Sequence, residues 1–250
     1  MPYFCAVSGL VAVVLVYLAA LRYAYVRSAK LRDMVGCVLS PSENCAFDVG
    51  ISSVAKSCLW FLVIHLSLSF LYHFADLLLF GEAPEAGIAD AVSALPLWVV
   101  LLLPPVLEET AFRLPLKRRR AYIVLSAAVM MFFVSAILFS TRVYDVTWPR
   151  LLACAAMVPI AWFWGYKWIA GLRFKTWFWA LVLFFAFLHI LNYDLGAMGT
   201  GEWARVILKE GVKVPSALMF SYVRLRHGFA VSVALHFFVN LIAFLLGSLA

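Results

Sequence analysis

Long apolar stretches recur along the whole chain and are separated by short polar connections. Eight such segments can be marked, at about 4–21, 57–80, 94–113, 121–140, 151–168, 176–193, 214–225 and 229–249. A helix that crosses a bilayer needs about 20 largely apolar residues, and the segment at 214–225 is the shortest of the eight. The pattern predicts an all-α fold, a polytopic membrane bundle of about eight transmembrane helices.

Composition agrees with this pattern. Hydrophobic residues make up 66% of the 250 residues and charged residues 13%, whereas soluble domains average about 25% charged. Eight spans leave little chain for a soluble domain, so residues 1–250 are expected to form a single integral membrane domain. The first segment lacks the positive n-region and cleavage site of a signal peptide, which predicts a retained span.

The basic residues indicate an orientation. With eight spans, 15 of the 20 lysines and arginines fall on one side, in the stretches 22–56, 113–120, 167–175 and 224–226. By the positive-inside rule this side is cytoplasmic and both termini are external. The expected localisation is multi-pass in a membrane, the cell membrane if the source is prokaryotic. The other side holds the connection with Glu82, Glu85 and Asp90 and the longest external connection, 194–213. This side as a whole carries only Arg142, Arg150, Arg205, Lys209 and Lys213.

The net charge of +7 would also suit a nucleic-acid-binding protein, but the basic residues form short clusters between apolar runs, without an extended basic face. Topology explains the charge, and no nucleic acid partner is expected. The five cysteines lack CxxC spacing, so neither a disulfide framework nor a zinc knuckle is indicated.

Two adjacent carboxylates lie near the end of the third segment, in the run Pro104-Pro105-Val106-Leu107-Glu108-Glu109-Thr110-Ala111-Phe112-Arg113. An ionised group inside a bilayer is costly unless it is paired or hydrated. On a helix Glu109 and Arg113 are i and i+4 and share a face, while Glu108 is rotated about 100° away. We therefore expect one carboxylate to be a structural partner of Arg113 and the other to be available. An ion pair at the membrane interface is the plainer alternative.

Two later segments carry polar residues in otherwise apolar surroundings. The sixth contains Phe185 and His189, and the eighth contains His236 and Asn240 at i and i+4. Each alone is as readily explained as polar contact between helices. Counted from their cytoplasmic ends, Glu108, His236 and His189 lie at depths of roughly 13, 15 and 21 Å, which helix tilt can reconcile.

A carboxylate, two imidazoles and an amide suit the hydrolysis of a peptide bond by water. The carboxylate can take the proton of the water, and imidazole and amide N–H groups can stabilise the oxyanion of the tetrahedral intermediate. No serine or cysteine nucleophile accompanies these residues, so direct attack by water is favoured. We expect a cavity that opens toward the cytoplasm, because the motifs lie nearer that side.

The ordered set Glu-Glu-x-x-x-Arg, Phe-x-x-x-His and His-x-x-x-Asn resembles the CAAX protease and bacteriocin-processing (CPBP) family, which includes the type II CAAX prenyl endopeptidase. The resemblance covers about residues 95–245, the expected catalytic core. It implies a glutamate-type intramembrane protease in which Glu108 is the catalytic base, His189 positions the water, and His236 with Asn240 forms the oxyanion site. Glu109, Arg113 and Phe185 would be supporting residues.

The resemblance further implies that membrane lipid surrounds the protein and that the substrate is a membrane-anchored protein or peptide, which can be lipidated. No cofactor is expected. Two histidines and a glutamate are also a zinc-ligand set, so a zinc-dependent intramembrane metalloprotease is the nearest alternative, although no His-Glu-x-x-His is present. A non-enzymatic immunity or scaffold protein and a proton-coupled transporter are alternatives of other classes.

Overall fold

The computed structural model describes residues 2–80, 96–193 and 198–247, and every regular element in them is a helix. Within these residues five helices are long and apolar enough to cross a membrane: Ser8–Arg27, Ile51–Phe80, Arg120–Leu138, Phe174–Asn192 and Phe229–Leu246. The prediction of an all-α membrane bundle with several spans is confirmed at this level.

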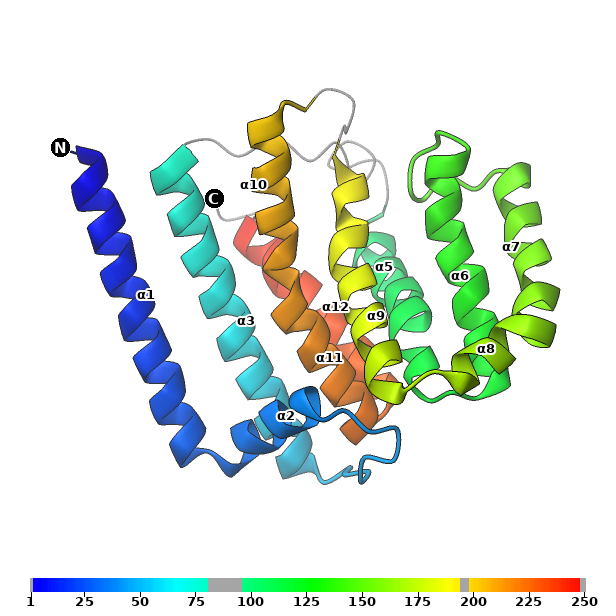
Figure 1. The fold of residues 1–250 in the computed structure, drawn as a ribbon, viewed down its shortest axis with the longest axis horizontal. Coiled ribbons are helices and arrows are strands. Elements are labelled where there is room, and N and C mark those ends of the chain that lie inside the picture. Colours follow the sequence, from blue (N-terminus) through cyan, green and yellow to red (C-terminus); the bar gives the residue numbers. More distant parts are fainter. Residues whose placement is uncertain (1, 81–95, 194–197, 248–250) are drawn as a thin grey trace.

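The helices stand side by side, with α1 (Pro2–Arg27) at one edge and α6 (Arg120–Leu138) with α7 (Trp148–Ile160) at the other (Figure 1). The short helix α2 (Ala29–Leu39) lies across one end, and α12 ends toward the end at which α1 begins. The remaining helices are α3 (Ile51–Phe80), α5 (Leu97–Phe112), α8 (Tyr166–Gly171), α9 (Phe174–Leu188), α10 (Thr200–Gly211), α11 (Lys213–His227) and α12 (Phe229–Gly247).

The core lies where α5, α9, α11 and α12 meet. Phe112, Phe185, Phe220 and Leu235, one from each of these helices, are each at most 4% exposed. The rings of Phe112 and Phe185 meet edge to face with centroids 5.4 Å apart. By contrast, the apolar window of α1 has no buried residue, as expected of a helix whose side chains face lipid.

The connection between the first two spans contains a helix that the sequence analysis did not predict. Helix α2 begins after Ser28, whose hydroxyl accepts a hydrogen bond from the Leu31 amide at 3.2 Å. Its buried residues, Leu31, Met34 and Cys37, recur every third residue and form one apolar stripe. Helix α2 is therefore an amphipathic helix that packs against the bundle rather than part of a loop.

The segment that follows, residues 40–50, crosses the end of α11. The Asp48 amide donates to the Arg226 carbonyl at 2.7 Å, and His227 donates through Nδ1 to the Asp48 carbonyl. Glu43 accepts from Arg118 Nε at 2.8 Å, which fastens the same segment to the turn after α5. Segment 40–50 thus joins the turn that precedes α6 to the turn that precedes α12.

The second half of the connection expected at 194–213 forms helix α10, which the sequence analysis did not predict. The amide of Gly199 donates to Glu202 in the first turn, at 2.8 Å. Arg205 makes a bidentate pair with Asp76 of α3, both bonds 2.7 Å. The shortest apolar segment, 214–225, lies in α11, which follows α10 after an interruption at Val212. Pro215 lies in the first turn of α11. A proline lacks the N–H of a regular helix and clashes with the preceding turn, which explains the break.

The fifth apolar segment also has an interrupted helix. Helix α7 passes into a π-helical turn, Ala161–Gly165, and then into α8. Pro159 lies just before this turn and cannot donate the usual hydrogen bond, so the register shifts there. The expected external connection with Glu82, Glu85 and Asp90 lies outside the described residues.

Arg150 of α7 holds the connection between α6 and α7. Its side chain is fully buried and donates to four backbone carbonyls, three of which belong to that connection, and to the Ser135 hydroxyl. The bonds to the Arg142 and Val143 carbonyls are both 2.8 Å long. The sequence analysis counted Arg150 as an external basic residue, whereas the structure uses its guanidinium as an internal donor.

Substitution of Arg150 is expected to destabilise the fold. Arg150→Met retains much of the aliphatic chain but leaves buried carbonyls without donors, so the free energy of unfolding should fall by about 2–3 kcal/mol. Denaturant unfolding in detergent measures this. The control is Arg142→Met, which alters an exposed side chain of the same connection and should change stability by less than about 0.5 kcal/mol. Equal effects of the two variants would contradict the role of Arg150.

Candidate functional site

Glu109 is the buried anchor of the site. It is fully buried on α5 and accepts hydrogen bonds from His236 Nδ1, at 3.0 Å, and from the Ser232 hydroxyl, both on α12. Arg113, one turn further along α5, places its Nε 3.7 Å from the same carboxylate. The i, i+4 pair expected from the sequence therefore forms, and the hydrogen bonds of Glu109 with His236 and Ser232 also join α5 to α12.

Arg113 is held by aromatic rings as well as by charge. Its guanidinium carbon lies 3.7 Å from the centroid of the Phe185 ring and 5.4 Å from that of Phe220. Phe185 also meets the His189 ring edge to face at 5.0 Å. The supporting residue Phe185 thus separates the buried cation from the histidine one turn away and fixes the position of both.

Glu108 points away from this network toward two imidazoles. Its Oε2 lies 3.9 Å from Nε2 of His189 and 3.7 Å from Nε2 of His236. These distances exceed those of hydrogen bonds, and 13% of its side-chain surface is exposed. The three residues come from α5, the end of α9 and α12, so the structure brings together groups that are far apart in the sequence. Their spacing leaves room for a water molecule that contacts the carboxylate and an imidazole together.

Hydrogen bonds on the far sides of the two rings define their tautomers. His189 Nδ1 lies 2.9 Å from the Phe185 carbonyl, and His236 Nδ1 lies 3.0 Å from Glu109. Both partners are acceptors, so in each ring Nδ1 carries the proton. In the neutral rings Nε2 is then a lone-pair acceptor directed toward Glu108, and it becomes a donor only when the imidazole is protonated.

A cavity of about 120 Å³ lies beside Glu108, large enough for several water molecules. It is lined by Glu108 and Phe112 of α5, by Tyr144 of the α6–α7 connection, and by His189 and Asn192 of the 3₁₀ turn His189–Asn192. Carboxylate, imidazole, phenol and amide groups therefore meet around a space that can hold water and part of a peptide.

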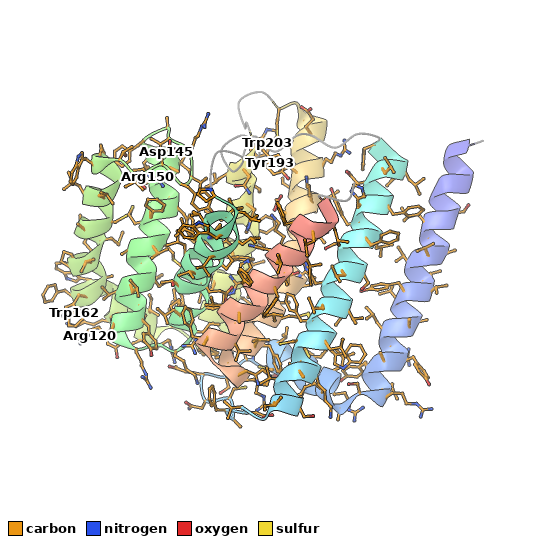
Figure 2. All side chains as sticks on the ribbon, turned by 180° about the vertical axis from the view of Figure 1, so that it is seen from behind. Arg120, Asp145, Arg150, Trp162, Tyr193 and Trp203 are labelled. Carbon is orange, nitrogen blue, oxygen red and sulfur yellow. The ribbon has the colours of Figure 1, made fainter. Side chains whose placement is uncertain are left out.

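The cavity lies toward the end of the bundle opposite the basic turn before α6, whereas the motifs were expected nearer the basic side. Its lining includes residues next to Asp145 and Tyr193, which Figure 2 places at the end of the bundle opposite Arg120 and Trp162. The basic turn before α6 is therefore at the far end of the molecule. The sequence placed the motifs only along their own helices, whereas the cavity is also lined by Tyr144 of the α6–α7 connection and by Asn192 of the turn after α9, which no span pattern locates.

Two lining residues were missed by the sequence analysis. Asn192 lies three residues after His189 and so on the same face of a 3₁₀ turn, a signal that the sequence contained. Tyr144 lies in a connection, and nothing in its sequence surroundings indicated a role. Asn240, the predicted oxyanion residue, is half-buried one turn beyond His236 on α12 and does not line this cavity.

No protein-family model, curated protein or solved structure matches this chain. The site therefore rests on its own geometry, and the resemblance to the CPBP family stays a prediction from the motifs. What the structure defines is the class: an all-helical membrane protein with a carboxylate and two histidines gathered inside the bundle. Within the described residues, no three histidine, cysteine or acidic side chains are grouped so as to hold a metal ion.

The two glutamates are expected to differ in their contribution to stability. Glu109→Gln removes the carboxylate that faces buried Arg113, so the free energy of unfolding should fall by about 3 kcal/mol. Glu108→Gln is the matched control, because Glu108 makes no hydrogen bond within the described residues and should cost less than about 1 kcal/mol. Denaturant unfolding in detergent compares the two, and equal losses would contradict the structural role of Glu109.

Proposed function

We propose that the chain is an intramembrane endopeptidase that hydrolyses peptide bonds of membrane-associated proteins or peptides with water activated by Glu108. The observation that carries the proposal is the position of the Glu108 carboxylate, 3.7–3.9 Å from Nε2 of two histidines beside a cavity inside an apolar bundle. An ionisable cluster at such a place is costly to maintain, which favours a functional role over a packing role.

In this proposal a water molecule lies between Glu108 and His189. Nε2 of His189 accepts one of its hydrogens and Glu108 takes the other as the oxygen attacks the carbonyl carbon of the substrate. The C–O bond forms as the carbonyl π bond becomes the oxyanion of the tetrahedral intermediate. When the C–N bond breaks, Glu108 returns the proton to the leaving amine.

In this proposal His236 faces the oxyanion, and Glu109 fixes the orientation of its ring. The Glu109 carboxylate accepts from Nδ1–H of His236 and so directs Nε2 toward Glu108, where Nε2 becomes a donor to the oxyanion when the ring takes up a proton. Glu109 is then a positioning residue, held in turn by Arg113. One well-placed donor of this kind contributes about 3–4 kcal/mol to stabilising the transition state.

The orientation in the membrane belongs to the same proposal. We infer eight passages, with α7 to α8 counted as one and α10 to α11 as one, and with both termini external. The beginning of α1 and the end of α12 lie toward the same end of the bundle (Figure 1), which supports an even number of passages. The end with Arg120 is then cytoplasmic by the positive-inside rule. The substrate would be a membrane-anchored segment, locally unwound, that reaches the cavity in the half of the bundle away from the basic residues.

Glu108→Gln is expected to lower kcat by about 10²–10⁴-fold, because it removes the general base. Glu109→Gln retains an acceptor for His236 Nδ1–H and should retain more activity. The assay is cleavage of a membrane-anchored peptide library by purified protein in detergent, with and without a strong zinc chelator.

Three outcomes of this assay are decisive. Cleavage that survives the chelator and is lost in Glu108→Gln supports the glutamate mechanism. Cleavage that the chelator abolishes and zinc restores identifies a metalloprotease instead. If the cleavage activity of Glu109→Gln, corrected for its folded fraction, were lower than that of Glu108→Gln, the assigned roles would be reversed.

The two asparagines can be told apart by substitution. Asn192 lines the cavity, so Asn192→Ala should lower kcat by about 10²-fold, as expected for loss of an oxyanion donor. Asn240→Ala should lower it by less than about 10-fold. The measurement is kcat on the substrate found above, with unfolding curves as the control for folding. The opposite order would assign the oxyanion amide to Asn240, as the family resemblance implies.

A further inference from the structure

A cleft of about 880 Å³ lies at the basic end of the bundle, far from the candidate active site. It is formed where α1 ends, α2 begins and α3 begins, and its cationic lining consists of Arg27, Lys30 and Lys56. The hydroxyl groups of Ser28, Ser52 and Ser53 also line it. Cations and hydroxyl donors around one cleft are the groups that bind phosphate.

The negative groups near this cleft are already engaged. Asp33, the one carboxylate in the lining, pairs with Arg226 and accepts from the Tyr222 hydroxyl at 2.6 Å. Burial raises the pKa of Asp33, but the hydrogen bonds from Arg226 and Tyr222 outweigh it and leave the pKa below its ordinary value. Asp33 is therefore ionised and satisfied by partners on α11.

Two cations in the cleft have no such partner. Lys30 donates to Ser53 at 2.6 Å and lies 3.9 Å from Asp48. Arg27 and Lys56 are exposed, and within the described residues neither lies within 4 Å of a carboxylate. With three cations and one carboxylate, the lining has a net charge of +2. The cleft thus presents positive charge that the described part of the protein leaves uncompensated.

The cleft lies at the level where phospholipid headgroups are expected. Arg27 is the last residue of α1, and Lys56 lies in the second turn of α3. Trp60 follows Lys56 by one helical turn and also lines the cleft, as aromatic residues at a membrane interface do. Beyond it α1 exposes apolar side chains such as Val16, 70% exposed, and Leu15, 61% exposed. A ligand with a phosphate and acyl chains fits a surface that changes in this order from cationic to aromatic to apolar.

We propose that the cleft binds the headgroup phosphate of an anionic phospholipid, whose acyl chains lie along α1 and α3. Arg27 and Lys56 contact the phosphate, and the hydroxyl groups of Ser28 and Ser52 donate to its remaining oxygens, whereas the Ser53 hydroxyl already donates to Asp48. The lipid would connect α1, which has few contacts with the bundle, to α2 and α3. A free phosphate has the same headgroup chemistry but cannot cover the apolar surface of α1.

The test is binding of a fluorescent phosphatidylglycerol to the purified full chain in neutral detergent. Each basic residue near a membrane surface contributes about 1 kcal/mol, so the double variant R27Q/K56Q should lose about 10-fold or more in affinity. The matched control is K167Q/K175Q, which removes two exposed cations of the basic end that do not line the cleft, and it should lose less than about 2-fold. Unlabelled phosphatidylglycerol should compete, whereas phosphatidylcholine and inorganic phosphate should not.

Other results would overturn the proposal. Equal losses in the two double variants would show that the basic surface attracts lipid diffusely. Competition by inorganic phosphate at the concentration effective for phosphatidylglycerol would identify a site for free phosphate. Competition by phosphatidylcholine would show that the charge of the lipid is not recognised. Unfolding curves in phosphatidylcholine distinguish loss of binding from loss of fold.

Discussion

A buried guanidinium is the constraint on which this structure depends. Arg113 is 1% exposed, and within the described residues its nitrogens have no hydrogen-bond partner. A cation in such surroundings costs several kcal/mol unless opposite charge and polarisable surfaces compensate it. Glu109 and the rings of Phe185 and Phe220 provide that compensation from α5, α9 and α11. One side chain therefore interacts with groups on all three of these helices.

The same interaction sets the geometry of the candidate site. With Glu109 committed to Arg113, His236 and Ser232, the helix turns the preceding residue by about 100°, and Glu108 faces His189 and the cavity. Phe185 lies against Arg113 and against His189, so the ring that shields the cation also positions an imidazole. Adjacent glutamates in one helix can thus differ in role because one of them is fully satisfied.

The sequence predicted the fold class and the main members of the site for identifiable reasons. Apolar segments long enough to span a membrane recur, and they predict the helices. The pairs Glu109 with Arg113 and Phe185 with His189 are four residues apart, so their proximity on a helix follows from the local sequence. The helices α2 and α10 were missed because their apolar stripes are short and mixed with charge. Tyr144 and the carbonyl contacts of Arg150 depend on where a connection folds back, which no local pattern encodes.

The two ends of the bundle have different chemistry, and this difference bears on how a substrate could approach. The basic end carries the cleft with Arg27 and Lys56, while the cavity beside Glu108 is lined by groups next to Asp145 and Tyr193 at the other end. A carboxylate that activates water must be hydrated, yet buried enough that its imidazole neighbours act on it strongly. A small cavity lined by Glu108 and His189 suits both requirements, and it lies away from the end that holds the cationic cleft. Anchoring at one end and the proposed chemistry toward the other would keep headgroup phosphates away from the Glu108 carboxylate, whose negative charge they would repel.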